Sequence, residues 1–202
     1  MILEDGKGGG KKAWIDDNNL VRTFAIQYTR GEHATELKSS WVFGSGLITI
    51  TSVDEQGLLY FKNGETSNFH MERLSVALGP TTGGVNTDAS RIRLYRNPTT
   101  GTLIDVGGTT DASIKQNRNF GSTDTLSALS LLYKGDASST VTDGDVVAET
   151  FIASNTNVGF SSLPVDFILS NNDSIAVTIE AQDSNTSMKV LVSLYGYFNG
   201  DS

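Results

Sequence analysis

The feature of this sequence that most restricts its fold is a succession of short runs in which apolar and polar side chains alternate. A period of two puts successive side chains on opposite faces of an extended strand. Gly, Asn, Asp or Pro bounds these runs, as is typical of strands joined by turns. The predicted strands are residues 20–29, 46–52, 57–63, 69–78, 91–96, 102–106, 128–133, 146–152, 165–169, 174–180 and 188–198.

One segment comes closest to a helical pattern. It covers residues 122–132, but Gly135 and the Ser/Thr-rich stretch 138–142 end it early. We therefore predict an all-β protein, either a jelly roll of two packed sheets or a Greek-key β-sandwich, and we favour the jelly roll. A chain of 202 residues is within the range of one such domain, which we place at residues 20–202.

The last predicted strand, residues 188–198, is apolar on both faces. One face carries Met188, Val190, Val192, Leu194 and Phe198, and the other carries Leu191, Tyr195 and Tyr197. A strand of this kind is usually covered on both faces. We therefore expect it to be central in its sheet or to lie at a subunit contact, and we predict a homotrimer.

Residues 1–19 differ from the rest because they are rich in Gly, Lys, Asp and Asn and contain few apolar side chains. Such a segment has too little apolar surface to fold alone, so we predict an extended N-terminal arm. Its basic and apolar side chains together can anchor in a groove and pair with surrounding acids. The predicted partner-binding residues are Lys11, Lys12, Trp14 and Ile15.

The charge of the chain bears on its partners. Lys and Arg number 15 against 23 Asp and Glu, a formal net charge of -8, so we expect no basic face for nucleic acid. Beyond residue 140, eight acidic residues stand against Lys189 alone. Such an acidic segment is typical of a solvated face that keeps a protein soluble. We predict no nucleic-acid partner.

The sequence also bears on the compartment. The N-terminus has acidic residues and glycines where a secretion signal needs a basic start and an apolar run. No later stretch is as long and apolar as a membrane span. We therefore predict synthesis in the cytoplasm and no association with a membrane.

Residue types that carry catalysis are sparse or unsuitably spaced. Cysteine is absent, which excludes thiolate nucleophiles, thiolate metal sites and disulfides. His33 and His70 lack the spacing of zinc hydrolases or of a nucleophile and base pair. The glycine-rich stretch 6–12 lacks the spacing of a phosphate loop. Four carboxylates are candidates for glycoside chemistry, namely Asp143, Asp145, Glu149 and Asp166. Sequence does not give their separation, and we predict that the chain is not an enzyme.

Two oxygen-rich turns, residues 143–145 (DGD) and 171–173 (NND), have the ligand types that calcium prefers. Neither matches the helix-loop-helix calcium pattern, and Asx residues are common in tight turns, so we predict no metal and no other cofactor. Trp14 and Trp41 have the ring surface that stacks on sugars. For Trp41, which lies beside a predicted strand, a packing anchor is the commoner role.

Four segments span most of the chain in a recognisable order. They are an arm at residues 6–25 (GKGGGKKAWIDDNNLVRTFA), a pair ending in a Lys-Asn turn at 48–63 (ITITSVDEQGLLYFKN), an Asn-Pro turn at 91–107 (RIRLYRNPTTGTLIDVG) and the run 117–122 (NRNFGS). Together these segments resemble a family of tailed-bacteriophage virion structural proteins, of the head decoration or cement type. The resemblance brings no catalytic residues.

The resemblance implies a jelly-roll subunit that lies as trimers on the outer capsid surface of the virion after synthesis in the host cytoplasm. Its partner would be the major capsid protein. Bridging neighbouring capsomers would stabilise the shell by burying new interface, with no chemistry needed. The alternative is a host-surface or carbohydrate-binding component of a head or tail fibre. A glycan-degrading virion enzyme is disfavoured by the scarcity of His and the lack of β-helix repeats.

Overall fold

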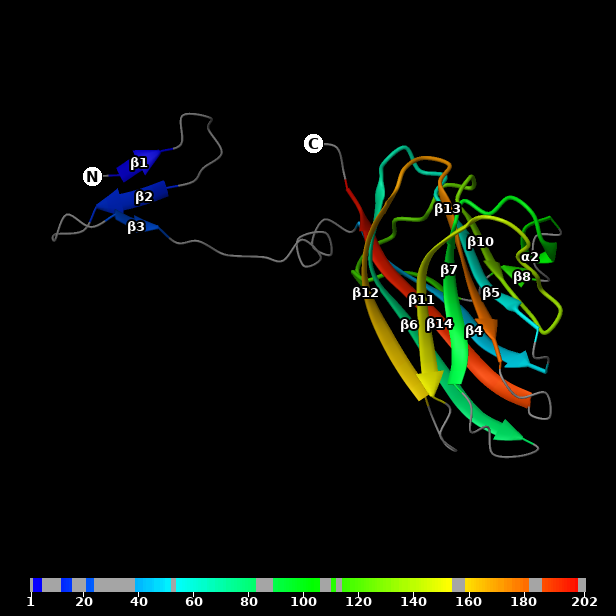
Figure 1. Ribbon diagram of the computed structural model, residues 1–202. Helices are drawn as coiled ribbons and strands as arrows, with labels where there is room; N and C mark the ends of the chain where they lie inside the picture. Colours follow the sequence, from blue (N-terminus) through cyan, green and yellow to red (C-terminus); the bar gives the residue numbers. More distant parts are fainter. Residues whose placement is uncertain are drawn as a thin grey trace. The chain divides into compact units, whose positions relative to one another are not determined.

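The chain forms two compact units, Met1–Arg30 and Gly31–Ser202, in a computed structural model (Figure 1). The structure describes residues 2–4, 12–15, 21–23, 39–51, 54–82, 89–105, 110–111, 114–153, 159–181 and 187–199.

The N-terminal unit contains a small antiparallel sheet of β1 (Ile2–Glu4), β2 (Lys12–Ile15) and β3 (Val21–Thr23), with β2 in the middle. The predicted first strand of the sandwich began at residue 20, but β3 pairs with β2 inside this unit. Residues 24–29 of that predicted strand lie outside the described residues. The boundary between arm and sandwich at residues 19 and 20 therefore stays a prediction.

The larger unit is a β-sandwich of two antiparallel sheets, which confirms the all-β prediction (Figure 1). The first sheet has the order β11-β7-β13-β5-β10-β8 and the second has the order β12-β6-β14-β4-β9. The strands of the first sheet are β5 (Gln56–Lys62), β7 (Ala89–Arg96), β8 (Thr110–Asp111), β10 (Leu131–Lys134), β11 (Asp145–Ala153) and β13 (Ser174–Glu180). Those of the second are β4 (Ser40–Ile50), β6 (Phe69–Thr82), β9 (Ile114–Asn117), β12 (Gly159–Leu169) and β14 (Ser187–Phe198).

Alternation along the strands divides core from surface, as the sequence predicts. In β7, Ile92 and Leu94 are buried between the sheets, whereas Arg91, Arg93 and Tyr95 point to the outer face. The strand therefore contributes an apolar row to the core and a polar row to the outside.

Aromatic rings from both sheets meet in the core. The ring centroid of Phe43 lies 4.5 Å from that of Phe61 on the opposite sheet and 5.4 Å from that of Phe69. Trp41 is only 5% exposed and stacks on Phe43, so its predicted role as a packing anchor is confirmed. Truncating one of these buried rings to alanine would cost about 3–5 kcal/mol.

Strand β14 is central in its sheet, which is one of the two positions predicted for residues 188–198. It lies between β4 and β6, and its inward side chains are fully buried. On its other face Tyr195 lies under the guanidinium of Arg73, and Tyr197 stacks flat on His70. The predicted placement of His70 in a strand is thus confirmed, whereas His33 lies outside the described residues.

The predicted strand at residues 102–106 is wrong, because Thr102–Asp105 forms the short helix α2. Gly101 has a φ of +132°, and its carbonyl accepts hydrogen bonds from the backbone N–H groups of Ile104 and Asp105. The turn geometry that glycine permits therefore starts a helical turn here. In the part of the chain that the structure describes, no helix is long and apolar enough to cross a membrane.

Helix α2 helps to cover part of the outer face of the six-stranded sheet. Leu103 is fully buried against Tyr60 and Ala176, and the ring of Tyr60 stacks on Tyr133 with centroids 5.8 Å apart. This second, smaller core explains why β13 is buried on both faces. The segment 107–127, for which no strand was predicted, also contains structure, because β8 and β9 lie within it.

Candidate interaction site

The two sheets end next to each other at the strands β11 and β12, which follow one another in the chain (Figure 1). Each is the terminal strand of its sheet, so one side of each has no strand neighbour among the described residues. An open strand edge presents a row of N–H and C=O groups that another chain can pair with. This side of the sandwich, β11 with β12, is called the open edge below.

Large apolar side chains are exposed along the open edge. Val146 and Phe151 on β11 are 49% and 59% exposed, and Ile168 on β12 is 56% exposed. These three are half of the large hydrophobic side chains that are exposed within the described ranges. Large apolar side chains that are exposed on an edge strand offer surface that a partner chain can cover.

A small pocket opens between the two edge strands. Its volume is about 170 Å³, and Val147, Phe167 and Ile175 give it apolar walls, while Arg96 and Asp173 supply charge. A pocket of this size suits one apolar side chain of a partner rather than a whole small molecule.

The two edge strands differ in how regular they are. Strand β12 carries Pro164, which lacks an N–H, and its pairing with β6 shifts register between Pro164 and Phe167. Proline and bulges are devices that protect an edge from strand addition. Strand β11 has its bulge near its start, between Val146 and Ala148, and pairs regularly with β7 from there on. The open row of β11 is therefore the better site for pairing.

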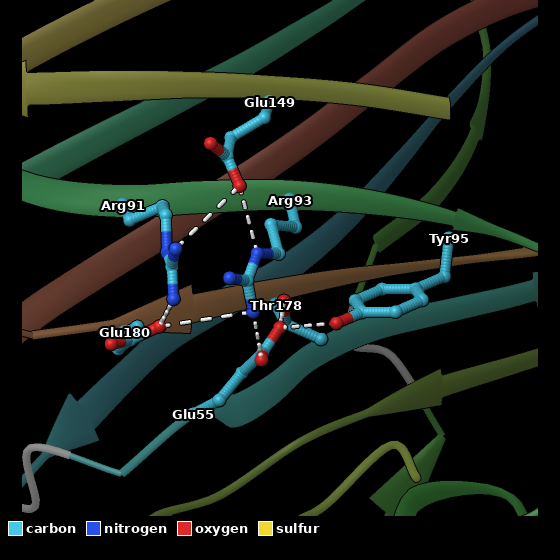
Figure 2. Close-up of polar contacts among 7 residues, drawn as sticks. All are labelled: Glu55, Arg91, Arg93, Tyr95, Glu149, Thr178 and Glu180. Carbon is cyan, nitrogen blue, oxygen red and sulfur yellow. Dashed lines mark hydrogen bonds and ion pairs between the residues drawn. The ribbon is translucent and has the colours of Figure 1, made fainter. Parts of the chain in front are cut away.

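A cluster of five charged side chains fixes β11 to the sheet (Figure 2). Arg93 donates from Nε to Glu149 of β11 at 2.9 Å and from Nη1 to Glu55, which precedes β5. Arg91 pairs with Glu180 of β13, and its Nη1 lies 3.9 Å from the Glu149 carboxylate. The cluster, called the charged clamp below, thus ties β11, β7 and β13 together across the outer face.

The pKa values of Arg93 and of the neighbouring Tyr95 are both raised at the charged clamp. The hydrogen bond to Glu149 raises the pKa of the Arg93 guanidinium. Glu55 also accepts hydrogen bonds from the hydroxyls of Tyr95 and Thr178, and burial followed by the Glu55 contact raises the pKa of Tyr95. Carboxylates that accept several hydrogen bonds in this way hold neighbouring strands together.

The four carboxylates considered for glycoside chemistry come from three different segments. Asp145 and Glu149 lie on β11 and Asp166 lies on β12, while Asp143 lies in the turn before β11. Glu149 belongs to the charged clamp. The four candidates from the sequence are therefore distributed over two strands and a turn.

The oxygen-rich turn at 143–145 is explained by hydrogen bonds within the protein. Asp143 accepts from the hydroxyl and N–H of Thr99 and from the N–H of Thr100. These hydrogen bonds lower the pKa of Asp143 to about 2, and the bond from the Thr99 hydroxyl contributes most. The carboxylate thus joins the turn after β7 to the turn before β11.

The second oxygen-rich turn, 171–173, is closed in the same way. Asp173 accepts from the backbone N–H of Ser170 at 2.9 Å and from the side-chain amide of Asn97 at 2.9 Å. Asn97 in turn accepts from the N–H of Ser174. Across the described residues, no group of three His, Asp or Glu side chains is arranged to hold a metal ion.

The predicted partner-binding residues lie in the N-terminal unit. Lys12, Trp14 and Ile15 belong to β2, where Trp14 stands opposite Ile2 and Arg22 in the register. Lys11 lies outside the described residues. The structure describes the backbone of β2 and not its side chains, so the role of these four residues stays a prediction.

Sequence reasoning missed Val146, Phe151 and Ile168. A signal for Phe151 was present, because Phe151 and Ile152 are adjacent and a strand must point one of them outward. Which of the two is covered depends on neighbouring strands, and the pairing with β7 decides it.

The chain was also compared with known proteins. No protein-family model matches it, and no curated protein matches it significantly. The resemblance to phage virion proteins remains a prediction from the sequence.

Proposed function

We propose that this chain is a structural virion protein that binds the outside of a phage capsid and stabilises the shell by bridging capsomers. Its body is a jelly-roll sandwich, it assembles as a homotrimer, and residues 1–19 act as an arm that contacts the major capsid protein. The observation that carries the proposal is the open edge, where the unpaired strand β11 combines with exposed apolar side chains.

Strand addition at the open edge suits a protein that works by attachment. Backbone hydrogen bonds from β11 give affinity, and pockets for alternate side chains give specificity. Phe151 would be covered by the added partner, and an apolar side chain of the partner would fill the pocket beside Val147. The charged clamp holds β11 in place, so little ordering of the edge is required on binding.

The distribution of charge supports a second contact through the N-terminal residues. Residues 1–30 contain five Lys and Arg against four Asp and Glu, whereas residues 31–202 contain ten against 19. The sandwich is thus strongly acidic, whereas residues 1–30 are close to neutral. A nearly neutral segment can lie on the acidic sandwich of a neighbouring copy without strong repulsion, which is compatible with a trimer.

The order of strands supports a jelly roll or a related Greek-key sandwich. In the five-stranded sheet the first strand of the sandwich, β4, lies beside the last, β14. In the six-stranded sheet β13 lies between β5 and β7. Neighbours that are far apart in the sequence are typical of Greek-key connections.

The test is decoration of phage heads that lack this protein, scored by occupancy and by resistance of the heads to heat. We expect the intact chain to bind, Phe151→Glu to bind much more weakly, and a chain lacking residues 1–15 to stay folded but lose most of its occupancy. Leu47→Glu is the matched control, because Leu47 is 60% exposed on a strand of the other sheet. Heads that the intact chain neither binds nor stabilises would refute the proposal.

A further inference from the structure

A groove of about 620 Å³ lies beside β9, at the end of the sandwich opposite to the open edge in the sheet order. One wall is β9 with the turn that follows it, and the other wall is the segment 124–131. Trp41, Leu132 and Tyr133 also line it. Its volume is within the range of about 300–1,000 Å³ that is usual for ligand sites.

The first wall is held rigidly by its own turn. The N–H of Asn119 donates to Asn117 Oδ1 at 2.9 Å, and the N–H of Ser122 donates to the carbonyl of Asn119 at 2.9 Å. Arg118 fixes the turn to the sheet, because its N–H donates to the carbonyl of Ser40 and its guanidinium lies 3.7 Å from Glu72. The turn is therefore formed before any ligand arrives.

The second wall is held by Glu65. Its Oε1 atom accepts from the N–H of Ser127 and from the hydroxyl of Ser130 at 2.9 Å. The Ser130 hydroxyl also accepts from the N–H of Gly64 at 3.1 Å. Both walls are thus preorganised, which lowers the entropy cost of binding.

The lining combines exposed aromatic surface with uncharged polar groups. Phe120 projects from the first wall and is 98% exposed, although the turn around it is rigid. The solvent-accessible amide and hydroxyl side chains in the groove belong to Gln116, Asn117, Asn119, Ser122, Thr125 and Ser127, whereas Ser130 is buried. Lys115 and Asp124 add one charge of each sign, so the lining carries no net charge.

We propose that this groove binds a neutral oligosaccharide. A sugar ring has a face of C–H groups that packs on an aromatic ring, and hydroxyls that both donate and accept hydrogen bonds. Phe120 supplies the ring, and amides and hydroxyls, which also donate and accept, supply the polar partners. The balanced charge of the lining and the acidic sandwich disfavour an anionic polymer.

This inference goes beyond attachment to a capsid and does not depend on it. The groove lies in the sandwich and uses none of Val146, Phe151 or Ile168. Binding of a sugar can therefore be tested on the isolated chain, and loss of one activity leaves the other measurable.

The experiment is an NMR titration of the full-length ¹⁵N-labelled protein with maltohexaose, cellohexaose, mannohexaose and chitohexaose. We expect at least one of them to shift the backbone amides of residues 117–122 and 126–131. Phe120→Ala should weaken that binding about tenfold. The fold should be unchanged in this variant, because the Phe120 side chain is almost fully exposed.

The matched control is Leu129→Ala, which removes an apolar side chain that is 72% exposed in the neighbouring turn but does not line the groove. Its affinity for the sugar should equal that of the unaltered protein. The proposal is overturned if none of the four sugars shifts these amides, or if Phe120→Ala binds as tightly as the unaltered protein. It is equally overturned if a Ser/Thr-rich peptide shifts them and the sugars do not.

Discussion

The two sides of the sandwich differ in the length of the strands that end them. On one side the sheets end in β11 and β12, of nine and 11 residues, and on the other they end in β8 and β9, of two and four. Very short edge strands are a common protection against unwanted pairing. The sandwich is therefore closed to strand addition on one side, and the other side is where a partner strand has room to pair.

The two sides are also stabilised differently. Near β8 the backbone of neighbouring strands packs closely against Gly135. At β11 the charged clamp holds the strand through long polar side chains. Close packing tolerates almost no change of volume, whereas charged side chains at a partly exposed face contribute more modestly. Substitutions on the two sides should therefore differ in the size of their effect.

The largest effect is expected on the side of the short strands, at Gly135. A Cβ atom there would lie 1.8 Å from the carbonyl oxygen of Gly57, which cannot move without disturbing β5. Gly135→Ala should lower the free energy of unfolding by about 3 kcal/mol or more, measured by urea denaturation. Gly121→Ala is the control, because its Cβ would meet only Asn119 Oδ1 at 3.4 Å. Equal stability of the two variants would contradict the close packing described for this side.

A smaller effect is expected from breaking the charged clamp. Arg93→Ala removes the common partner of Glu55 and Glu149, and the Arg93 side chain is only 19% exposed. The free energy of unfolding should fall by about 1–2 kcal/mol, between the values typical of exposed and buried ion pairs. Hydrogen exchange should accelerate in β11 more than in β10. Arg96→Ala, at the exposed end of the same strand, is the control. Unchanged exchange in β11 would show that the clamp does not hold the edge.

The smallest effect concerns the turn that leads into β11, and it depends on pH. The pKa of Asp143 is lowered from 3.8 to about 2, so its hydrogen bonds to Thr99 and Thr100 stabilise the fold fully above pH 3.8. This contribution is lost as the pH falls toward 2. Asp143→Asn should reduce the difference between the melting temperatures at pH 5 and pH 2, followed by circular dichroism. A difference that matches the unaltered protein would exclude this role.

Much of the sandwich could be predicted because many of its strands have a recognisable pattern of apolar side chains within their own sequence. Residues 57–63, 174–180 and 188–198 were assigned correctly from alternation and apolar content. Strand β9 was missed because its sequence, IKQN, has no such pattern and depends on pairing with β4. Helix α2 was missed because its four residues depend on the turn at Gly101.

The candidate site was less predictable than the fold. Arg91, Arg93 and Tyr95 are spaced two apart, so the sequence does place them on one face of a strand. Their partners Glu55, Glu149 and Glu180 come from three other segments, and only the pairing of strands brings these together. An open edge is likewise a property of the whole sheet rather than of any one strand.

The position of β14 has a consequence for the order of folding. Strand β4 lies near the start of the sandwich, yet its neighbour β14 ends at Phe198, and the hydrogen bond from Ser40 to Gly196 joins residues 156 positions apart. On the ribosome the five-stranded sheet therefore stays incomplete until the last strand has been made. Contacts between residues so far apart in the sequence form slowly, on the order of milliseconds to seconds, because the intervening chain must close into a loop before the contact stabilises it. During that interval β4 and β6 lack the strand that separates them, so their open edges are exposed to pairing with other nascent chains.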